Sequence, residues 1–193
     1  MSRSIDIQRA RRGIDEFLRG LGHDPDANPD LRRTAERVVE AWTNDLLAGE
    51  TRDVPAILRD GSSAAGAGDK GLVVLRNLAT VTVCPHHLLP AVGSATVLYV
   101  PGDRIAGLGT VARLVDACAR RLVLQEEIGE RVATALVEHL GAKGALCRLS
   151  MMHTCLVARG ERKHDARVDT VALAGSLLQA GPDRDLAMAE LRG

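Results

Sequence analysis

The sequence predicts an α+β fold with an antiparallel sheet, and the order of its patterned segments carries this prediction. Two segments with helical periodicity come first, then two β-rich segments, then two more helical segments and two more β-rich segments. A parallel sheet needs a long crossover between every two strands, and the paired strands leave no room for one. A stretch rich in Gly, Ser and Ala over residues 60–69 separates the helical N-terminal third from the rest.

The N-terminal third is expected to contain two amphipathic helices. Residues 4–21 place apolar side chains at near-helical spacing. The Asp-, Asn- and Pro-rich segment 23–30 is typical of a loop. Asp30 is expected to cap a second helix over residues 31–48, which ends before Gly49.

The pattern changes to β structure from Leu72 onward, where β-branched residues become frequent. The expected strands are 72–83, 92–100, 145–158 and 166–177, and the expected helices between them are 108–122 and 126–140. These patterns divide the chain into an N-terminal helical segment (1–60), a flexible loop (61–71), a domain of strands and helices (72–180) and a C-terminal tail (181–193).

Composition excludes several classes of partner. The chain has 193 residues, with 25 Lys plus Arg against 25 Asp plus Glu, so it lacks the basic excess that nucleic acids or anionic membranes require. No apolar run approaches the roughly 20 residues that cross a bilayer, and the N-terminus carries no secretory signal. Four cysteines in such a chain indicate thiols or metal ligands. We therefore expect a cytoplasmic globular protein without nucleic-acid or membrane partners.

Two clusters of Cys and His form the strongest chemical signal. Cys84 and His87 lie three residues apart at the end of a predicted strand, a spacing from which both can chelate one ion. Cys155 lies in another predicted strand and would complete a Cys₂His set. Three protein ligands leave the fourth tetrahedral position for water, which is the pattern of catalytic zinc. Zinc-bound water ionises near neutral pH and supplies hydroxide.

Two more histidines accompany these ligands. His86 precedes His87, and His153 lies two residues before Cys155, on the same side if both belong to a strand. His153 is therefore a candidate general acid or base. Each residue alone is more often a buried apolar thiol or a core histidine, but the coincidence of both clusters favours the metal site.

Two charged segments are weaker candidates for functional sites. Gln125, Glu126 and Glu127 open the predicted helix 126–140, where a solvated first turn favoured by the helix dipole is the simpler explanation. Residues 159–163, beginning at Arg159, form a candidate anion site or an ordinary charged hairpin turn.

Several segments in order along the chain resemble the GTP cyclohydrolase I family: RRTAERVVEAW, CPHHLLP, GLGTVARLVDACARRLVLQEE and MHTCLVARGERK. The resemblance runs from about Asn28 to Leu177. It implies a tunnelling fold (T-fold), in which a four-stranded antiparallel sheet carries two antiparallel helices and is preceded by N-terminal helices. It also implies a toroidal homodecamer with active sites between subunits, and hydrolysis of GTP at C8 to give 7,8-dihydroneopterin triphosphate and formate.

The resemblance also assigns roles to residues. It implies that zinc is held by Cys84, His87 and Cys155, that His86 and His153 are catalytic, and that Gln125 and Glu126 read the guanine. It further implies that the triphosphate meets Arg113 and Arg159, with Arg37 at a basic position of the N-terminal helix.

The chain departs from the family pattern mainly where ribose and phosphates bind. Pro85 stands where the family usually has Glu, Gly109 and Thr110 stand for Ser and Lys, and Glu40 stands for Lys. In addition, Ala35 replaces the Pro of a Thr-Pro pair. Each lost charge-assisted contact is worth about 1.5–3 kcal/mol, so the phosphate contacts are expected to weaken by several kcal/mol.

Three functions follow from these observations. The leading one is the zinc-dependent conversion of GTP to 7,8-dihydroneopterin triphosphate. The second is a paralogue in specialised biosynthesis that accepts fewer phosphates or another guanine derivative, or that stops at an earlier product. The third, from a different class, is a non-catalytic assembly subunit that binds zinc only structurally.

Overall fold

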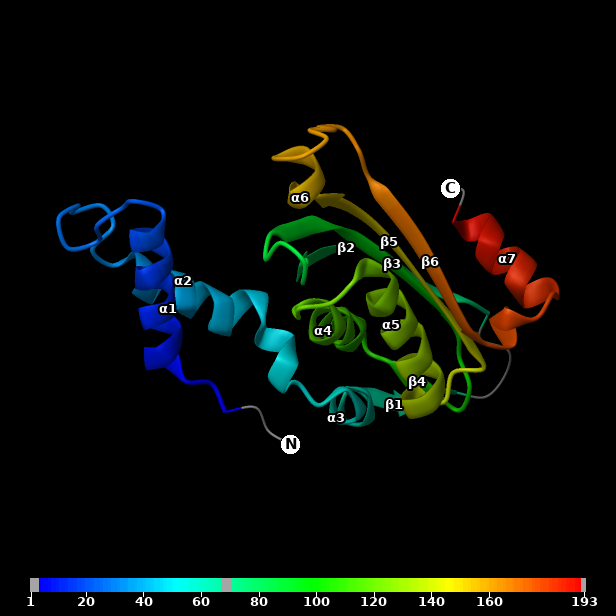
Figure 1. Cartoon of the computed structure of the whole chain (residues 1–193). Coiled ribbons are helices and arrows are strands. Elements are labelled where there is room, and N and C mark those ends of the chain that lie inside the picture. The colour runs from blue at the N-terminus through cyan, green and yellow to red at the C-terminus, as the bar shows by residue number, and fades with distance from the viewer. Residues whose placement is uncertain (1–3, 67–70, 192–193) are drawn as a thin grey trace.

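A four-stranded antiparallel sheet forms the centre of the molecule (Figure 1). The computed structural model describes residues 4–66 and 71–191. Sheet order follows chain order, so each strand pairs with the strand nearest to it in sequence. The strands are β2 (Val73–Val83), β3 (Pro90–Val100), β5 (Gly144–His153) and β6 (Val168–Gly175). The predicted α+β class is confirmed.

One face of the sheet carries the main core. Helices α4 (Leu108–Ala119) and α5 (Gln125–Leu140) cover this face (Figure 1). Alternate residues of a strand point to the same face, and the core residues of β3 and β5 fall at odd positions, such as Val97, Tyr99 and Leu149. With only three aromatic residues in the chain, this core consists mainly of aliphatic side chains around the fully buried Tyr99.

The other face is covered near one end by the C-terminal helix α7 (Pro182–Glu190), which follows the single turn Ser176–Leu178. Even-numbered strand residues such as Leu98 and Leu146 form a second core there with Ala187. Residues after 181 were expected to be a tail. Of these, residues 182–190 form α7, because the apolar side of this helix contacts the second face of the sheet.

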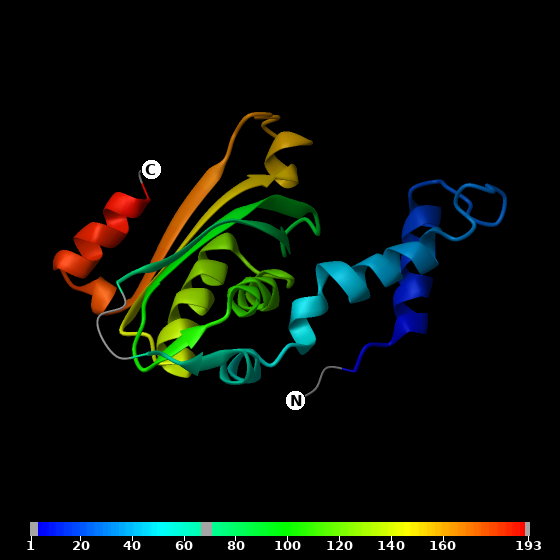
Figure 2. The ribbon, with the colours of Figure 1, turned by 180° about the vertical axis from the view of Figure 1, so that it is seen from behind.

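An arm of helices projects from the sheet domain, as the two opposite views show (Figures 1 and 2). It consists of α1 (Ile7–Gly20) and α2 (Thr34–Ala41), which pass into a π-helical turn (Trp42–Leu46) and a 3₁₀ turn (Ala48–Thr51). The single helix expected over residues 31–48 begins later, at Thr34, and its α-helical part ends earlier, at Ala41. None of the helices in the described ranges is long and apolar enough to span a membrane.

The predicted cap of the second helix is also wrong. Asp30 lies in a turn, where its backbone N–H donates to Asn28 Oδ1 at 3.0 Å, and the residue that precedes α2 is Arg33. By contrast, Asp6 caps α1 by accepting from the backbone N–H of Arg9 at 2.8 Å.

Between the arm and the sheet lie two short elements that the sequence patterns did not predict. Helix α3 (Val54–Asp60) is followed by strand β1 (Ser62–Ala64), which pairs antiparallel with β4 (Arg104–Ala106). The first part of the segment expected to be a flexible loop is therefore a strand. Residues 67–70 of that segment lie outside the described residues.

The predicted strand 145–158 also ends earlier than expected. β5 stops at His153, and residues 154–157 form a single helical turn, α6 (Thr154–Val157). The backbone N–H of Ala158 donates to the carbonyl of Thr154 at 2.9 Å, which closes this turn. Cys155 therefore lies in a helical turn and does not share a strand face with His153.

The arm meets the sheet domain at Gly49. Its N–H donates to the carbonyl of Arg120 at 3.0 Å, and its own carbonyl accepts from the Arg121 guanidinium. A Cβ at this position would lie 2.7 Å from the carbonyl oxygen of Ala117 and 2.9 Å from that of Arg120. Only glycine allows the two backbones to approach this closely.

We predict that Gly49→Ala lowers the free energy of unfolding by about 1–3 kcal/mol, because the added methyl group must displace backbone atoms. Denaturant unfolding followed by circular dichroism measures the change. Gly20→Ala is the matched control, since a Cβ at Gly20 meets nothing within 4 Å. Its stability is expected to stay the same or rise by up to about 1 kcal/mol. Equal stability of the two variants would contradict the close-approach argument.

Candidate functional site

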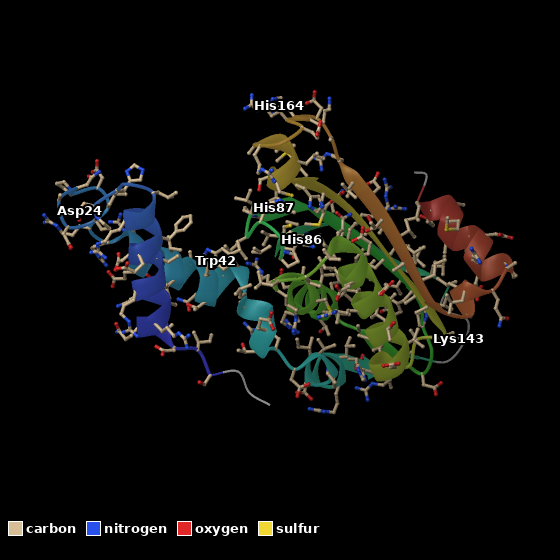
Figure 3. The ribbon with its side chains drawn as sticks, viewed as in Figure 1. Asp24, Trp42, His86, His87, Lys143 and His164 are labelled. Atoms are coloured by element: carbon tan, nitrogen blue, oxygen red, sulfur yellow. The ribbon has the colours of Figure 1, made fainter. Side chains whose placement is uncertain are left out.

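Strand register brings two distant segments of the chain together at one end of the sheet. Val83 pairs with Pro90 across the β2–β3 hairpin, and Ala91 pairs with His153 across β3 and β5. The hairpin loop that begins at Cys84 therefore lies beside the turn that contains Cys155. Figure 3 shows His86 and His87 at this end, and Lys143 at the opposite end of the sheet.

Backbone hydrogen bonds shape both segments. In the hairpin loop, the N–H of Leu88 donates to the carbonyl of Cys84, and the N–H of Cys84 donates to the carbonyl of Leu89, both at 2.9 Å. In the second segment, the Thr154 hydroxyl donates to the carbonyl of Pro90 at 2.6 Å. This bond fixes the start of α6 against the end of β3, next to the hairpin loop.

The side chains of Cys84, His87 and Cys155 form a donor cluster. One ligand atom from each lies within 4.8 Å of the others, and no second group of this kind was found in the part of the chain that the structure describes. Two sulfurs and one imidazole suit zinc, and three protein ligands leave one coordination position open. The donor set therefore fits the predicted metal centre.

The protonation of Cys155 depends on its neighbours. Burial raises the pKa of its thiol, the nearby Cys84 raises it further, and the guanidinium of Arg159 opposes both effects. Metal binding displaces protons from such thiols. The remaining cysteines differ from this pair, because burial raises the pKa of Cys118 to about 11 and that of Cys147 to about 12. Both belong to the main core.

Two imidazoles lie close to the Cys84 sulfur. Its Sγ is 3.7 Å from Nδ1 of His87 and 3.9 Å from Nδ1 of His86. The two rings stand edge to face, with centroids 6.3 Å apart. Because only His87 belongs to the donor cluster, His86 remains as an exposed imidazole beside it.

His153 lines a cavity that Cys84, His87 and Cys155 also line. Burial lowers the pKa of its imidazole, and the carboxylate of Glu126 opposes this effect. Burial thus favours the neutral form of the His153 imidazole, which accepts a proton. Its Nε2 lies 2.8 Å from Oε1 of Gln125, the first residue of α5.

A cavity of about 280 Å³ joins these groups. Cys84, His87 and Cys155 line it together with both free histidines, and the beginning of α5 closes it from the side. Glu126 is exposed there, whereas Gln125 is 2% exposed and makes internal hydrogen bonds. The further lining residues are Thr82, Pro85, Val123, Leu124, Leu156 and Val168.

The three predicted arginines have different positions. Arg159 follows α6, and its positive charge lowers the pKa of the nearby Cys155 thiol. Arg113 lies on α4 and lines two other cavities together with Arg52. Arg37 is exposed on α2, in the arm. Within one chain, neither Arg113 nor Arg37 belongs to the lining of the metal-site cavity.

Thr110 is buried and holds Arg113. Its hydroxyl donates to the carbonyl of Gly61 at 2.8 Å and accepts from Nη2 of Arg113 at 3.1 Å. A Cβ on Gly61 would lie 2.1 Å from the Thr110 oxygen. The residue where the family usually has Lys is thus packed against the end of α3.

Comparison with known proteins agrees with the sequence resemblance. The GTP cyclohydrolase I family profile matches residues 10–192. The chain belongs to this family. It is 43% identical over 179 residues to GTP cyclohydrolase 1 of Chromobacterium violaceum, covering 90% of this chain and 82% of the relative. It is 35% identical over 182 residues to GTP cyclohydrolase 1 of Leifsonia xyli subsp. xyli, covering 94% of each.

A third relative, GTP cyclohydrolase 1 of Mycobacterium ulcerans, is 36% identical over 176 residues, covering 90% of this chain and 85% of the relative. These matches confirm the T-fold class for the sheet and helices described above. One solved structure, the archaeosine synthase QueF-Like in the apo form, aligns with a TM-score of 0.47 and 17% identity over 60% of this chain, too distantly to bear on the site.

Sequence patterns missed the residues that hold Gln125. Its amide nitrogen lies 2.8 Å from the carbonyl of Val168 and 3.1 Å from the hydroxyl oxygen of Thr170. These partners are more than forty positions away in the chain. No local motif marks them, because they reach Gln125 only through the pairing of β6 with β5.

We predict that Cys155→Ala abolishes zinc binding, because two remaining ligands hold the ion far more weakly than three. The unaltered protein is expected to hold about one zinc ion per chain, and the variant less than a tenth of that. Elemental analysis after zinc loading and gel filtration measures both.

Cys118→Ala provides the matched control, since it removes a thiol of the core and leaves the donor cluster intact. It is expected to keep its zinc. A Cys155→Ala protein that retained full zinc content would contradict the ligand assignment.

Proposed function

We propose that this chain is a zinc-dependent hydrolase that opens the imidazole ring of GTP at C8 and forms 7,8-dihydroneopterin triphosphate and formate. The observation that carries this proposal is the Cys₂His donor cluster with two further imidazoles and a carboxylate at one cavity. The relatives that carry the name GTP cyclohydrolase 1 support GTP as the substrate.

The proposed ligands of zinc are Cys84, His87 and Cys155. A zinc ion held by them supplies a Lewis acid that activates water for hydrolysis at neutral pH. Hydrolysis at C8 breaks two C–N bonds of the imidazole ring and releases this carbon as formate. Protons must leave the attacking water and reach the departing nitrogens during these steps.

The proposed proton carriers are His153 and His86. Burial lowers the pKa of His153, which favours the neutral imidazole that can accept a proton. His86 is exposed at the cavity beside Cys84 and is suited to exchange protons with solvent. The two imidazoles reach the cavity from different elements, the hairpin loop and the end of β5.

Guanine recognition is proposed for Glu126. A carboxylate accepts from the two adjacent N–H donors of the guanine edge, and Glu126 exposes its side chain at the cavity. The family resemblance places Gln125 beside Glu126 at the guanine, and its side-chain amide is buried and bonded to protein groups. Any contact from Gln125 to the base would come from its backbone.

Phosphate binding is proposed to need more than one copy of the chain. Arg159 lies near the metal ligands, but Arg113 and Arg37 belong to other surfaces of the same chain. A homodecamer with sites between subunits, as the family resemblance implies, would let these two arginines reach a neighbour's cavity. A cytoplasmic location is part of the same proposal, since two of the four cysteines are proposed zinc ligands and the other two are thiols of the core.

A second candidate is supported by Thr110 and Glu40. Thr110 is buried against Gly61 and provides no cation, and Glu40 places an exposed carboxylate on α2 near Arg37. Both changes reduce the positive charge available to a triphosphate. This favours a paralogue that accepts a guanine compound with fewer phosphates or that stops at a ring-opened product.

Turnover of the zinc-loaded protein with GTP, GDP, GMP and guanosine separates the candidates. We expect formate and an oxidisable, fluorescent pterin from GTP, with the rate falling as phosphates are removed. Formate without pterin, or faster turnover of GMP or guanosine, would support the altered paralogue. No formate from any of the four would support the non-catalytic zinc-binding subunit and contradict the proposed reaction.

We predict that Glu126→Gln lowers kcat/KM for GTP by about 10- to 100-fold, because it replaces a charged acceptor with an amide that can offer only one oxygen. Steady-state kinetics measures the loss. Glu127→Gln is the matched control, since Glu127 pairs with Arg131 at 3.0 Å on the same helix and does not line the cavity. An equal loss in both variants would contradict recognition by Glu126.

A further inference from the structure

The side chain of Gln125 joins three elements at the back of the metal-site cavity. It is 2% exposed and opens α5, and its amide reaches β5 and β6. The amide nitrogen lies 2.8 Å from the carbonyl oxygen of Val168 and 3.3 Å from that of Leu149. A third acceptor, the hydroxyl oxygen of Thr170, is 3.1 Å away.

These partners fix which end of the amide faces which group. Backbone carbonyls only accept hydrogen bonds, so the NH₂ end of Gln125 must point to Val168 and Leu149. A flipped amide would place its oxygen against the carbonyl oxygens of Val168 and Leu149 and lose both hydrogen bonds, which is costly. The amide oxygen therefore faces His153, 2.8 Å from Nε2.

The orientation of this amide determines where His153 carries its proton. An amide oxygen accepts and cannot donate, so the hydrogen bond requires a proton on Nε2 of the imidazole. The other ring nitrogen, Nδ1, has no hydrogen-bond partner among the residues that the structure describes. The His153 ring lines the cavity, so Nδ1 is the nitrogen left to exchange a proton with a bound substrate.

We infer that Gln125 is a positioning residue that holds His153 as its Nε2–H tautomer in a fixed orientation and so assigns proton exchange with substrate to Nδ1. The kinetic consequence rests on the proposed function, whereas the tautomer is a property of the protein alone. The inference extends the family resemblance, which places Gln125 among the residues that read the guanine. In this structure the amide has both ends occupied by protein groups.

Nitrogen NMR of the zinc-loaded protein, with ¹⁵N-labelled histidine, tests the tautomer directly. We expect His153 to show a protonated Nε2 whose proton exchanges slowly with water, together with an unprotonated Nδ1. Protonation of Nδ1 in place of Nε2, or rapid exchange of both positions, would overturn the inference. This measurement on the unaltered protein does not depend on the folding of any variant or on turnover.

Gln125→Met tests the role of the amide, because it keeps a side chain of similar length and removes both ends of the hydrogen-bonding group. The slowly exchanging Nε2 proton is expected to disappear. Loss of an outer partner that orients an imidazole commonly costs about 10- to 100-fold in activity. We expect a loss of that size in kcat, with KM changed less than about threefold.

Two controls separate positioning from general stability. Thr170→Val removes one acceptor of the Gln125 amide and leaves the oxygen that faces His153, so the Nε2 proton and kcat should persist. Gln179→Met makes the same substitution at an exposed position and should change neither. If Thr170→Val lowered kcat as much as Gln125→Met while Nε2 stayed protonated, the amide would be only structural and the inference would fail.

The two proposals fail in different ways. Absence of turnover by the unaltered protein with every guanine compound would remove the proposed reaction and leave the NMR result standing. Unchanged kcat in Gln125→Met, with the protected Nε2 proton retained, would remove the inference and leave the proposed reaction standing.

Discussion

The registers of β3 with its two neighbours are the constraint on which the site depends. One register sets where the hairpin loop begins at Cys84, and the other sets where β5 ends at His153. A shift of either pairing by one residue would turn the side chains of that strand to the opposite face. Because α4 and α5 bury one face of both strands, such a shift would expose the core, so core packing also protects the geometry of the metal ligands.

Two kinds of structural element position the side chains of the site. Its metal donors come from a hairpin loop and a single helical turn, which are short segments closed by a few backbone bonds. Its acid–base imidazole at His153, in contrast, ends a long central strand and contacts the first turn of α5. A metal ion bound by Cys84, His87 and Cys155 would join these two short segments directly. The second kind is ordered by the protein itself.

Much of this fold follows from sequence pattern, and the errors have physical causes. β2, β3, α4 and α5 were predicted within a few residues because burial imposes a clear period on each. Cys155 was placed in a strand because the apolar run that contains it continues past His153, and nothing local marks the change to a helical turn. Asp53 and Pro55 were local signals for α3, since Asp53 caps it and Pro55 occupies its first turn. A helix of seven residues is too short to show a period.

The candidate site was predictable only in part. Cys and His clusters are rare enough to be found without a structure. The spacing of Cys84 and His87 predicts a chelating pair, and Cys155 in the second cluster is expected to complete the set. The partners of Gln125 were not predictable, because they depend on which strand lies beside α5. The positions of Arg37 and Arg113 also needed three dimensions, since sequence resemblance does not say which chain supplies a residue to a site shared between subunits.

Helix α7 protects an apolar face of the sheet from water. Arg76 of β2 donates to the backbone carbonyl of Glu190 at 2.7 Å, and the contacts of Ala187 and Leu191 cover the apolar outer side of the sheet. A protein shortened before Pro182 would present this row of leucines and valines to water. Such a product would retain every proposed catalytic residue and yet be prone to aggregate, so truncations and insertions should leave α7 whole.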